Sequence, residues 1–255
     1  MKKITGKEKI GLALGGGGVL GAAHIGVLKA MEEYDLSIQA ITGTSIGAFV
    51  AALYAFGSSW VDIREIARGI NWLDASEISL SQYGLLSNKQ LGDFIADHIG
   101  EVTFDQAAVP SAMTATDITN GEKVILDQGD VARAVMASTC IPGIYEPVEI
   151  NRRQLVDGGM VENVPLSPLI DLGADYLIGV SLTERYLEKE PENILDVLLR
   201  SYYFSIEKTT EIQTEKADLL IKPDLGSFDL IDPGQVEELM ETGYAEARKV
   251  LSRVS

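Results

Sequence analysis

The stretch IGLALGGGGVLGAAHIGVLKAM, residues 10–31, gives the clearest indication of the fold. Its first five residues read as a short buried strand, and four consecutive glycines, Gly15 to Gly18, follow them directly. Apolar residues then recur at helical spacing as far as Met31, which predicts a helix. The chain therefore opens with a strand that turns through glycines into a helix.

The same order repeats at once. Residues 38–42 form a second short apolar run, and residues 46–56 show a second apolar helix pattern. This alternation of strand and helix predicts parallel pairing with right-handed crossovers.

The rest of the chain continues the alternation. Strands are expected at 112–116, 123–126, 148–150, 154–156, 176–182 and 219–221, and helices at 61–70, 89–99, 130–138, 194–216 and 235–254. Asn120-Gly121 is a strong turn signal between two strands, and residues 76–88 read as a surface loop. We expect one domain, residues 1–255, built as a three-layer α/β/α sandwich around a mostly parallel central sheet.

The charge balance excludes one class of function. Lys and Arg total 21 against 38 for Asp and Glu, so the formal net charge is −17. A nucleic-acid binder needs clustered cations to neutralise phosphates, so no nucleic-acid partner is expected. Apolar residues make up 46% of the chain, which is enough for a packed core.

Cysteine content and the N-terminus bear on location. Cys140 is the single cysteine, which rules out an internal disulfide and a Cys-rich zinc site and fits a reducing compartment. Lysines ahead of an apolar stretch resemble a signal peptide, but the four glycines disfavour the helix that such a segment adopts. No stretch approaches the ~18 to 20 apolar residues of a membrane span. We expect a cytoplasmic protein with peripheral membrane contact at most.

The sharpest chemical signal is GTSIG, Gly43 to Gly47, placed between a predicted strand and a predicted helix. A serine on such a sharp strand-to-helix turn presents its hydroxyl at the sheet edge as a nucleophile, and the flanking glycines permit the tight backbone. Ser45 could instead simply cap the N-terminus of the helix. The pentapeptide alone leaves both interpretations open.

The glycine run after the first strand is the second signal. Free backbone N–H groups at a helix N-terminus suit a developing oxyanion in acyl transfer, and they suit a phosphate equally well. Gly16, Gly18 and Gly21 also satisfy G-x-G-x-x-G, the fingerprint of a dinucleotide-binding module. That fingerprint needs an acidic residue at the end of the second strand, where the sequence has Ile41 and Thr42.

A serine nucleophile needs a base. The histidines are His24, early in the first predicted helix, and His98, at the end of another, and neither follows a late strand. A carboxylate is therefore the better candidate. Asp157 follows a strand-like stretch and precedes Gly158 and Gly159, although an ordinary turn aspartate would look the same.

Three ordered motifs, GGGGVLGAAHIGVLKAMEE, GTSIG and DGG, resemble the bacterial branch of the patatin-like phospholipase family, whose catalytic core is similar to that of cytosolic phospholipase A2. The resemblance spans roughly residues 10–181 and includes ASTCIPGIYEPV and NVP. It implies a serine acyl hydrolase on lipids that uses a Ser-Asp dyad and needs neither cofactor nor metal. The implied roles are nucleophile for Ser45, base for Asp157, nucleophile elbow for Gly43 and Gly47, and oxyanion hole for Gly16, Gly17 and Gly18.

One position departs from the family pattern. The family usually has Arg or Lys where this chain has Leu20. Loss of that cation could weaken catalysis or change the preferred substrate charge, so a non-catalytic lipid-binding or regulatory relative stays an alternative, as does the dinucleotide-binding module.

The sequence says less about the substrate and about partners. Large apolar residues could line an acyl channel or form a lid, although burial in the core is their more common fate; they are Trp60, Trp72, Leu73, Ile78, Leu80, Tyr83, Leu85 and Leu86. The negative charge favours zwitterionic, lyso or dispersed lipids over anionic membranes. Surplus aromatic residues on the long helix, Tyr203 and Phe204, could serve a homodimer contact.

Overall fold

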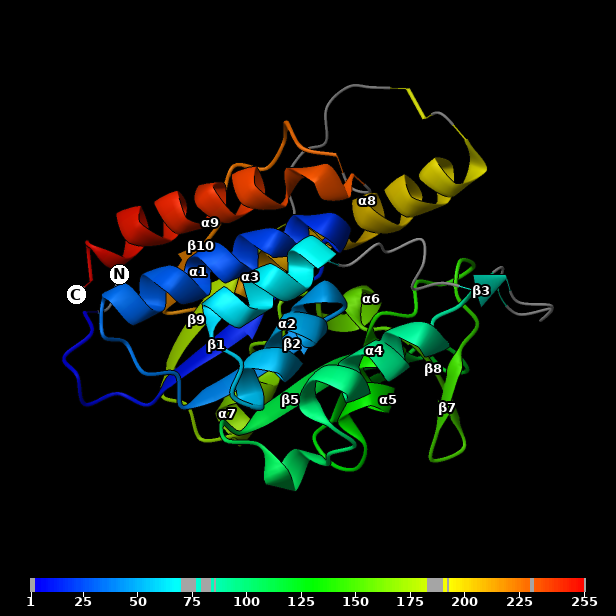
Figure 1. The fold of residues 1–255 in the computed structure, drawn as a ribbon, viewed down its shortest axis with the longest axis horizontal. Helices are drawn as coiled ribbons and strands as arrows, with labels where there is room; N and C mark the ends of the chain where they lie inside the picture. The colour runs from blue at the N-terminus through cyan, green and yellow to red at the C-terminus, as the bar shows by residue number, and fades with distance from the viewer. Residues whose placement is uncertain are drawn as a thin grey trace.

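Figure 1 shows the fold in a computed structural model, which describes residues 3–69, 77–78, 84, 86–182, 190–191, 193–229 and 232–254. Its main sheet has eight strands, paired in the order β10-β9-β1-β2-β5-β8-β7, with β6 also paired to β5. These strands are β1 Ile10–Leu14, β2 Ala40–Thr44, β5 Ser111–Asp117, β6 Lys123–Leu126, β7 Val148–Ile150, β8 Arg153–Asp157, β9 Tyr176–Val180 and β10 Leu219–Ile221. The sheet is parallel from β10 to β5 and antiparallel where β6, β7 and β8 join it, so the predicted α/β class with a mostly parallel sheet is confirmed.

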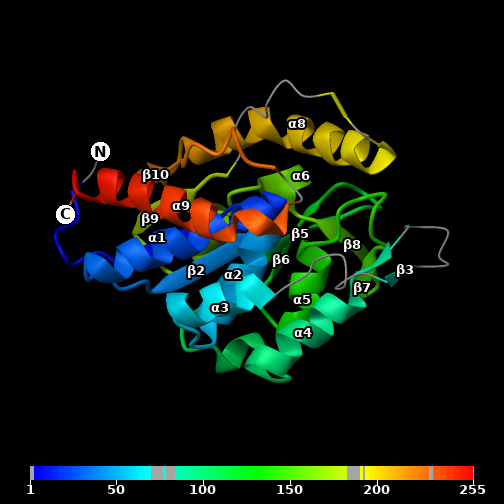
Figure 2. The ribbon, with the colours of Figure 1, turned by 45° about the horizontal axis from the view of Figure 1, so that its top comes forward.

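The helices lie on both faces of this sheet. They are α1 Ala22–Glu33, α2 Ile46–Ala55, α3 Trp60–Gly69, α4 Lys89–Ile99, α5 Val131–Ser138, α6 Gly159–Glu162, α7 Ser167–Asp171, α8 Ile194–Thr214 and α9 Val236–Leu251. Short 3-10 turns at Gly18–Gly21, Phe104–Gln106 and Pro233–Gln235 complete the described elements. Figure 1 looks onto the face that carries α1, α2, α3 and α9, and Figure 2 shows α8 along another side of the molecule.

Strand β1 shows why the central strands are apolar throughout. Leu12 and Leu14 belong to the main core, which includes residues of α1, α2 and α9. Ala13 belongs to a second, smaller core with Leu169 of α7. Because both faces of the strand are covered, every position along it is buried and the run reads as continuously apolar.

The pairing register brings two strand ends together. Thr44, the last residue of β2, pairs with Thr114 of β5, and Asp157, the last residue of β8, pairs with the next β5 residue, Ala115. Strand β6 pairs with residues 113–116 of β5 and so occupies the opposite edge. Because a strand has only two edges, β2 and β8 share one edge of β5 and their C-terminal ends meet there.

Most predicted elements appear with small shifts at their ends. Strand β1 and helix α4 have the predicted bounds, Gly121 turns the β5–β6 hairpin at φ 76°, and Asp130 caps α5 by accepting the Arg133 N–H at 2.8 Å. The loop predicted at 76–88 contains two short antiparallel strands, β3 Glu77–Ile78 and β4 Leu86–Ser87, and the rest of it lies largely outside the described residues. Helices α6 and α7 were not predicted.

The two aromatic residues of α8 that suggested a dimer contact differ in burial. Tyr203 is buried in a small cluster with Leu199, Ile206 and Ile144, whereas Phe204 is half exposed. A homodimer and the single-domain organisation both stay predictions. Across the described residues, none of the helices combines the length and the apolar composition needed to cross a bilayer.

Candidate active site

Ser45 stands on the turn that joins β2 to α2. Its backbone has φ 55° and ψ −126°, a positive φ that a non-glycine residue rarely adopts. The Ser45 carbonyl accepts the Ala48 N–H at 2.8 Å, but the Ser45 side chain makes no capping hydrogen bond. Ser45 thus occupies the N-cap position of α2, but its hydroxyl does not cap the helix.

The glycines on either side of this turn are required by close backbone contacts. A Cβ on Gly43 would lie 2.3 Å from the Gly47 carbonyl oxygen, and a Cβ on Gly47 would lie 2.1 Å from the Leu14 carbonyl oxygen. Any larger residue at position 47 would push α2 away from the end of β1. The turn can hold Ser45 in this conformation only because Gly43 and Gly47, two positions away on either side, lack side chains.

A second serine fixes the turn from the far side. The backbone N–H of Ser45 donates to Ser138 Oγ at 2.9 Å, and Ser138 Oγ donates in turn to the Thr114 carbonyl at 2.7 Å. Ser138 is fully buried at the end of α5. Nothing in the sequence pointed to Ser138, because a serine at the end of a helix gives no signal that it would meet Ser45.

Asp157 is buried beside Ser45 at the meeting point of β2 and β8. Its side chain is 1% exposed, and Oδ1 accepts the Gly159 N–H at 2.8 Å. Burial raises the pKa of Asp157 from 3.8 to about 6, and the nearby Ser45 hydroxyl and the Gly159 N–H partly offset this rise. The structure thus brings together a strained serine and a carboxylate of increased basicity.

Helix α8 contributes Tyr202 to the same site. Its hydroxyl lies 2.6 Å from where a Cβ on Gly159 would stand, and it also lowers the pKa of Asp157. Neither the Tyr202 hydroxyl nor Asp157 Oδ2 completes a hydrogen bond of regular geometry, so the tyrosine acts on the carboxylate by proximity. Nothing in the sequence placed Tyr202 beside Asp157, because the two residues lie in segments far apart in the chain.

The glycine loop lies against Ser45. A Cβ on Gly16 would be 3.1 Å from the Ser45 Cβ. The Gly16 N–H donates to Asn163 Oδ1 at 3.2 Å, whereas the amides of Gly17 and Gly18 have no acceptor among the described residues. Of the three predicted oxyanion-hole glycines, Gly17 and Gly18 therefore carry the N–H groups that are available to a ligand in this structure.

Leu20, which stands where the family usually has Arg or Lys, is a core residue. Its side chain is 1% exposed and belongs to the main core. The short 3-10 turn at Gly18–Gly21 places this residue in the core, where burying a charged group without a partner would be costly. The departure at this position changes core packing and leaves the glycine amides in place.

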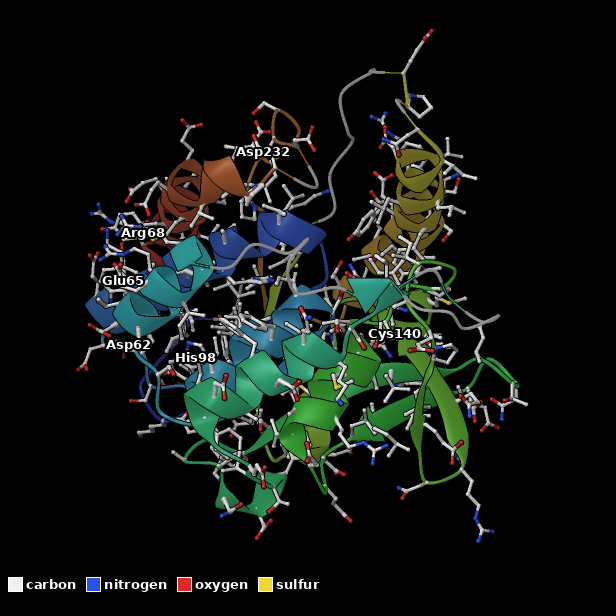
Figure 3. The ribbon with its side chains drawn as sticks, turned by 45° about the vertical axis from the view of Figure 1, so that its right-hand side comes forward. Asp62, Glu65, Arg68, His98, Cys140 and Asp232 are labelled. Atoms are coloured by element: carbon white, nitrogen blue, oxygen red, sulfur yellow. The ribbon has the colours of Figure 1, made fainter. Side chains whose placement is uncertain are left out.

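In the described part of the chain, His24, His98 and Cys140 form hydrogen bonds with backbone carbonyls and not with Ser45. His24 is fully buried, and His98 lies at the C-terminal end of α4, well away from Cys140 (Figure 3). Burial holds the pKa of Cys140 far above its usual range, so the thiol stays protonated and donates to the Glu146 carbonyl. Asp157 is thus the buried carboxylate that meets Ser45.

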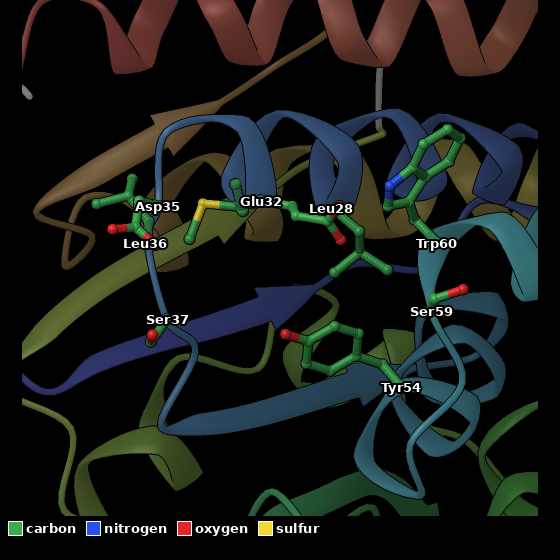
Figure 4. Close-up of a pocket in the computed structure, with 9 residues that line it drawn as sticks. Leu28, Glu32, Asp35, Leu36, Ser37, Tyr54, Ser59 and Trp60 are labelled. Carbon is green, nitrogen blue, oxygen red and sulfur yellow. The ribbon is translucent and has the colours of Figure 1, made fainter.

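The described residues also bear on metal and ligand binding. Among the described residues, no three His, Cys, Asp or Glu side chains gather in a way that could hold a metal ion. A pocket of about 200 Å³ lies between the end of α1 and the start of α3, with Tyr54 and Trp60 in its wall (Figure 4). Neither Ser45 nor Asp157 lines it, so it is separate from the site described above.

A strand-to-helix serine, a buried carboxylate at the end of a neighbouring strand and a glycine loop are the features of an α/β acyl-transfer site. Residues 12–170 match the family described as patatin-like phospholipase, which is more than half of the chain. The chain belongs to the patatin-like phospholipase family.

Related sequences agree with this assignment. An uncharacterised NTE family protein of Mycobacterium tuberculosis is 35% identical over 183 residues, which cover 70% of this chain and 50% of that protein. The lysophospholipase NTE1 of Meyerozyma guilliermondii is 26% identical over 99% of this chain but only 20% of its own length. The chain spans half the length of the mycobacterial relative and a fifth of the fungal one.

Two solved structures share the fold. VipD from Legionella pneumophila superposes with a TM-score of 0.68 at 14% identity, covering 99% of this chain and 70% of that one. The type III effector ExoU has a TM-score of 0.56 at 16% identity, covering 96% of this chain and 53% of that one. At these identities the likeness concerns the arrangement of the chain alone.

Proposed function

We propose that this chain is a serine acyl hydrolase that cleaves acyl esters of lipids, with Ser45 as nucleophile and Asp157 as general base. The observation that carries the proposal is the buried Asp157 carboxylate beside the Ser45 hydroxyl, with a pKa raised to about 6. At neutral pH such a carboxylate is ionised yet more basic than a solvated aspartate, which is what proton abstraction from a serine needs.

The proposed reaction has two stages. Asp157 takes the Ser45 proton as Oγ attacks the ester carbonyl, and the tetrahedral oxyanion accepts hydrogen bonds from the Gly17 and Gly18 amides. The ester C–O bond then breaks, the alcohol leaves with the proton from Asp157, and an acyl-serine remains. Water gives its proton to the same carboxylate and attacks the acyl-serine carbonyl. The bond to Ser45 Oγ then breaks, the proton passes from Asp157 to Ser45 Oγ, and the fatty acid leaves.

The proposed substrate class is a neutral or zwitterionic acyl ester such as a lysophospholipid. The fungal relative is named a lysophospholipase, and the net charge of −17 disfavours tight adsorption to an anionic membrane. The large apolar residues that could line an acyl channel are mostly outside the described part of the chain. Trp60 is described, and it lines the separate pocket at the start of α3.

The dyad is tested by matched pairs of substitutions. Ser45→Ala and Asp157→Asn should each abolish hydrolysis of a chromogenic acyl ester, and Ser45→Ala should abolish labelling by a fluorophosphonate probe. The controls are Ser111→Ala, which removes a buried hydroxyl at the opposite end of β5, and Asp117→Asn, which changes a buried carboxylate that lies near Arg153. Full activity in Ser45→Ala would overturn the proposal.

The two alternatives predict different results. A non-catalytic lipid-binding relative would bind lysophospholipid, but the fluorophosphonate probe would not label Ser45. A dinucleotide-binding module would gain thermal stability with NAD and show no esterase activity.

A further inference from the structure

One peptide unit of the glycine loop is held at both ends by side chains from distant parts of the fold. The carbonyl of Gly15 accepts a hydrogen bond from His24 Nε2 at 2.8 Å, and the N–H of Gly16 donates to Asn163 Oδ1 at 3.2 Å. These two groups belong to the same planar peptide, and they point in opposite directions because the bond is trans. His24, which binds the carbonyl, lies on α1. Asn163, which binds the N–H, lies directly after α6.

Both side chains are built to hold this one peptide. His24 is fully buried and Asn163 is 1% exposed. A carbonyl oxygen can only accept, so His24 carries its proton on Nε2, and burial lowers the pKa of His24 to about 4, which keeps the ring neutral. The second polar atom of each side chain, His24 Nδ1 and Asn163 Nδ2, is buried without a partner. A buried polar atom without a partner lowers stability. The hydrogen bonds to the loop are therefore the interactions that explain why a histidine and an asparagine are buried here.

The loop needs such a clamp because it is made of glycine. A run of four glycines lacks the Cβ atoms that restrict φ and ψ, so its peptide planes can turn at little cost. The backbone of Gly15 is tied to the end of β9 by its N–H, which donates to the Val180 carbonyl at 3.0 Å. The amides of Gly17 and Gly18 come next and have no acceptor in the described part of the chain. Fixing the Gly15–Gly16 peptide therefore anchors one end of the segment that carries these N–H groups, and the Leu20 N–H, which donates to the Gly17 carbonyl at 3.2 Å, anchors the other end.

We infer that His24 and Asn163 are positioning residues that lock the Gly15–Gly16 peptide and thereby aim the amides of Gly17 and Gly18 at the oxyanion formed on the Ser45 ester. This inference rests on the proposed function, because it assigns the two side chains to the oxyanion hole of that reaction. The residues act through the loop and do not touch the substrate. Preorganised donors matter because they need no reorientation as charge develops.

The test compares kinetics in four variants. His24→Ala should lower kcat for a chromogenic ester by ~10- to 100-fold with little change in KM, the size expected when oxyanion donors are misdirected. His24→Gln should retain most of kcat, because the Gln amide N–H can replace the Nε2 donor. Asn163→Ala should also lower kcat. Ile25→Ala is the matched control: it removes an equally buried side chain from the next position of α1 and should lose stability without a selective loss of kcat.

A double variant tests whether both residues act on one peptide. Once one hold is lost the peptide can turn, so the second substitution should cost less than it does alone, and His24→Ala with Asn163→Ala should be non-additive in kcat. Equal kcat losses in His24→Ala and Ile25→Ala, or full kcat in His24→Ala, would overturn the inference.

Hydrogen exchange gives a readout that does not require activity. Amides of residues 15–18 should exchange faster in His24→Ala and in Asn163→Ala than in the starting chain, and Ile25→Ala should leave them unchanged. Unchanged exchange in both variants would refute the clamp even if the chain proved inactive. Conversely, full activity in Ser45→Ala would refute the proposed function. Hydrogen exchange would then still test whether His24 and Asn163 hold the loop.

Discussion

The hydroxyl of Ser138 accepts the backbone N–H of Ser45 at 2.9 Å, so the residue at the strained turn is anchored by a side chain that lies 93 positions further along the chain. The Ser138 hydroxyl has its own acceptor in the Thr114 carbonyl. The hydroxyl of one serine thus connects α5, the turn and β5 at the point where β2 and β8 meet.

Ser138→Ala should therefore destabilise the chain and weaken catalysis together. It leaves a buried N–H without an acceptor, which costs about 1–3 kcal/mol of unfolding free energy, and it releases the turn that holds Ser45. Denaturant unfolding and ester hydrolysis check both effects. The matched variant is Ser111→Ala, whose buried hydroxyl has no partner to lose; similar losses in both would contradict a specific role for Ser138.

Asp157→Asn should stabilise the folded chain at alkaline pH. The folded-state pKa of Asp157 is raised, so its contribution to stability is fully present below the ordinary value of 3.8 and is lost as the pH rises through about 6. A rise of this pKa from 3.8 to about 6 corresponds to about 3 kcal/mol of unfolding free energy. The variant should exceed the starting chain by about that amount at pH 8, and the advantage should vanish near pH 4. A constant difference from pH 4 to pH 8 would refute the raised pKa.

The pH profile of activity should have an acidic limb set by Asp157. Because the base must be ionised, kcat/KM should fall as the pH drops through about 6. Tyr202 lowers the pKa of Asp157, so Tyr202→Phe should move this limb to higher pH. Tyr203→Phe, at the neighbouring buried position, should leave the limb in place. A limb that stays fixed in Tyr202→Phe would separate Tyr202 from the site.

Gly47→Ala should unfold the turn or displace α2. The new Cβ would stand 2.1 Å from the Leu14 carbonyl oxygen, which is backbone and cannot move aside without shifting β1. We expect a large fall in melting temperature and loss of fluorophosphonate labelling. Gly69→Ala is the control, because its Cβ would meet nothing within 4 Å, and it should be neutral or slightly stabilising.

The sequence predicts the framework of this site better than its surroundings. Strand β1, the glycine loop and the Ser45 turn are encoded within a few neighbouring residues, because an apolar run, glycines and a helical pattern follow one another. Asp157 could be proposed because it ends a strand and precedes two glycines. The resemblance to the family then joined these local signals into one site.

The residues that support the site could not be read in the same way. Ser138, Tyr202 and the hydrogen bond of Asn163 to Gly16 depend on contacts between segments far apart in the chain, and none of these side chains stands in a local pattern that differs from an ordinary helix or loop. Helices α6 and α7 were missed because four and five residues are too few to show a helical period. The role of Leu20 also required the fold, since only burial shows that it faces the core.

The positive φ of Ser45 sets a trade-off between stability and activity at a single position. Glycine adopts φ 55° without strain, so Ser45→Gly should raise the free energy of unfolding by about 1–3 kcal/mol, measured by denaturant titration, while removing the hydroxyl altogether. A variant that was no more stable would show that the turn is relaxed. The most robust version of this chain is thus expected to be an inert one, and attempts to strengthen the active protein should leave position 45 alone.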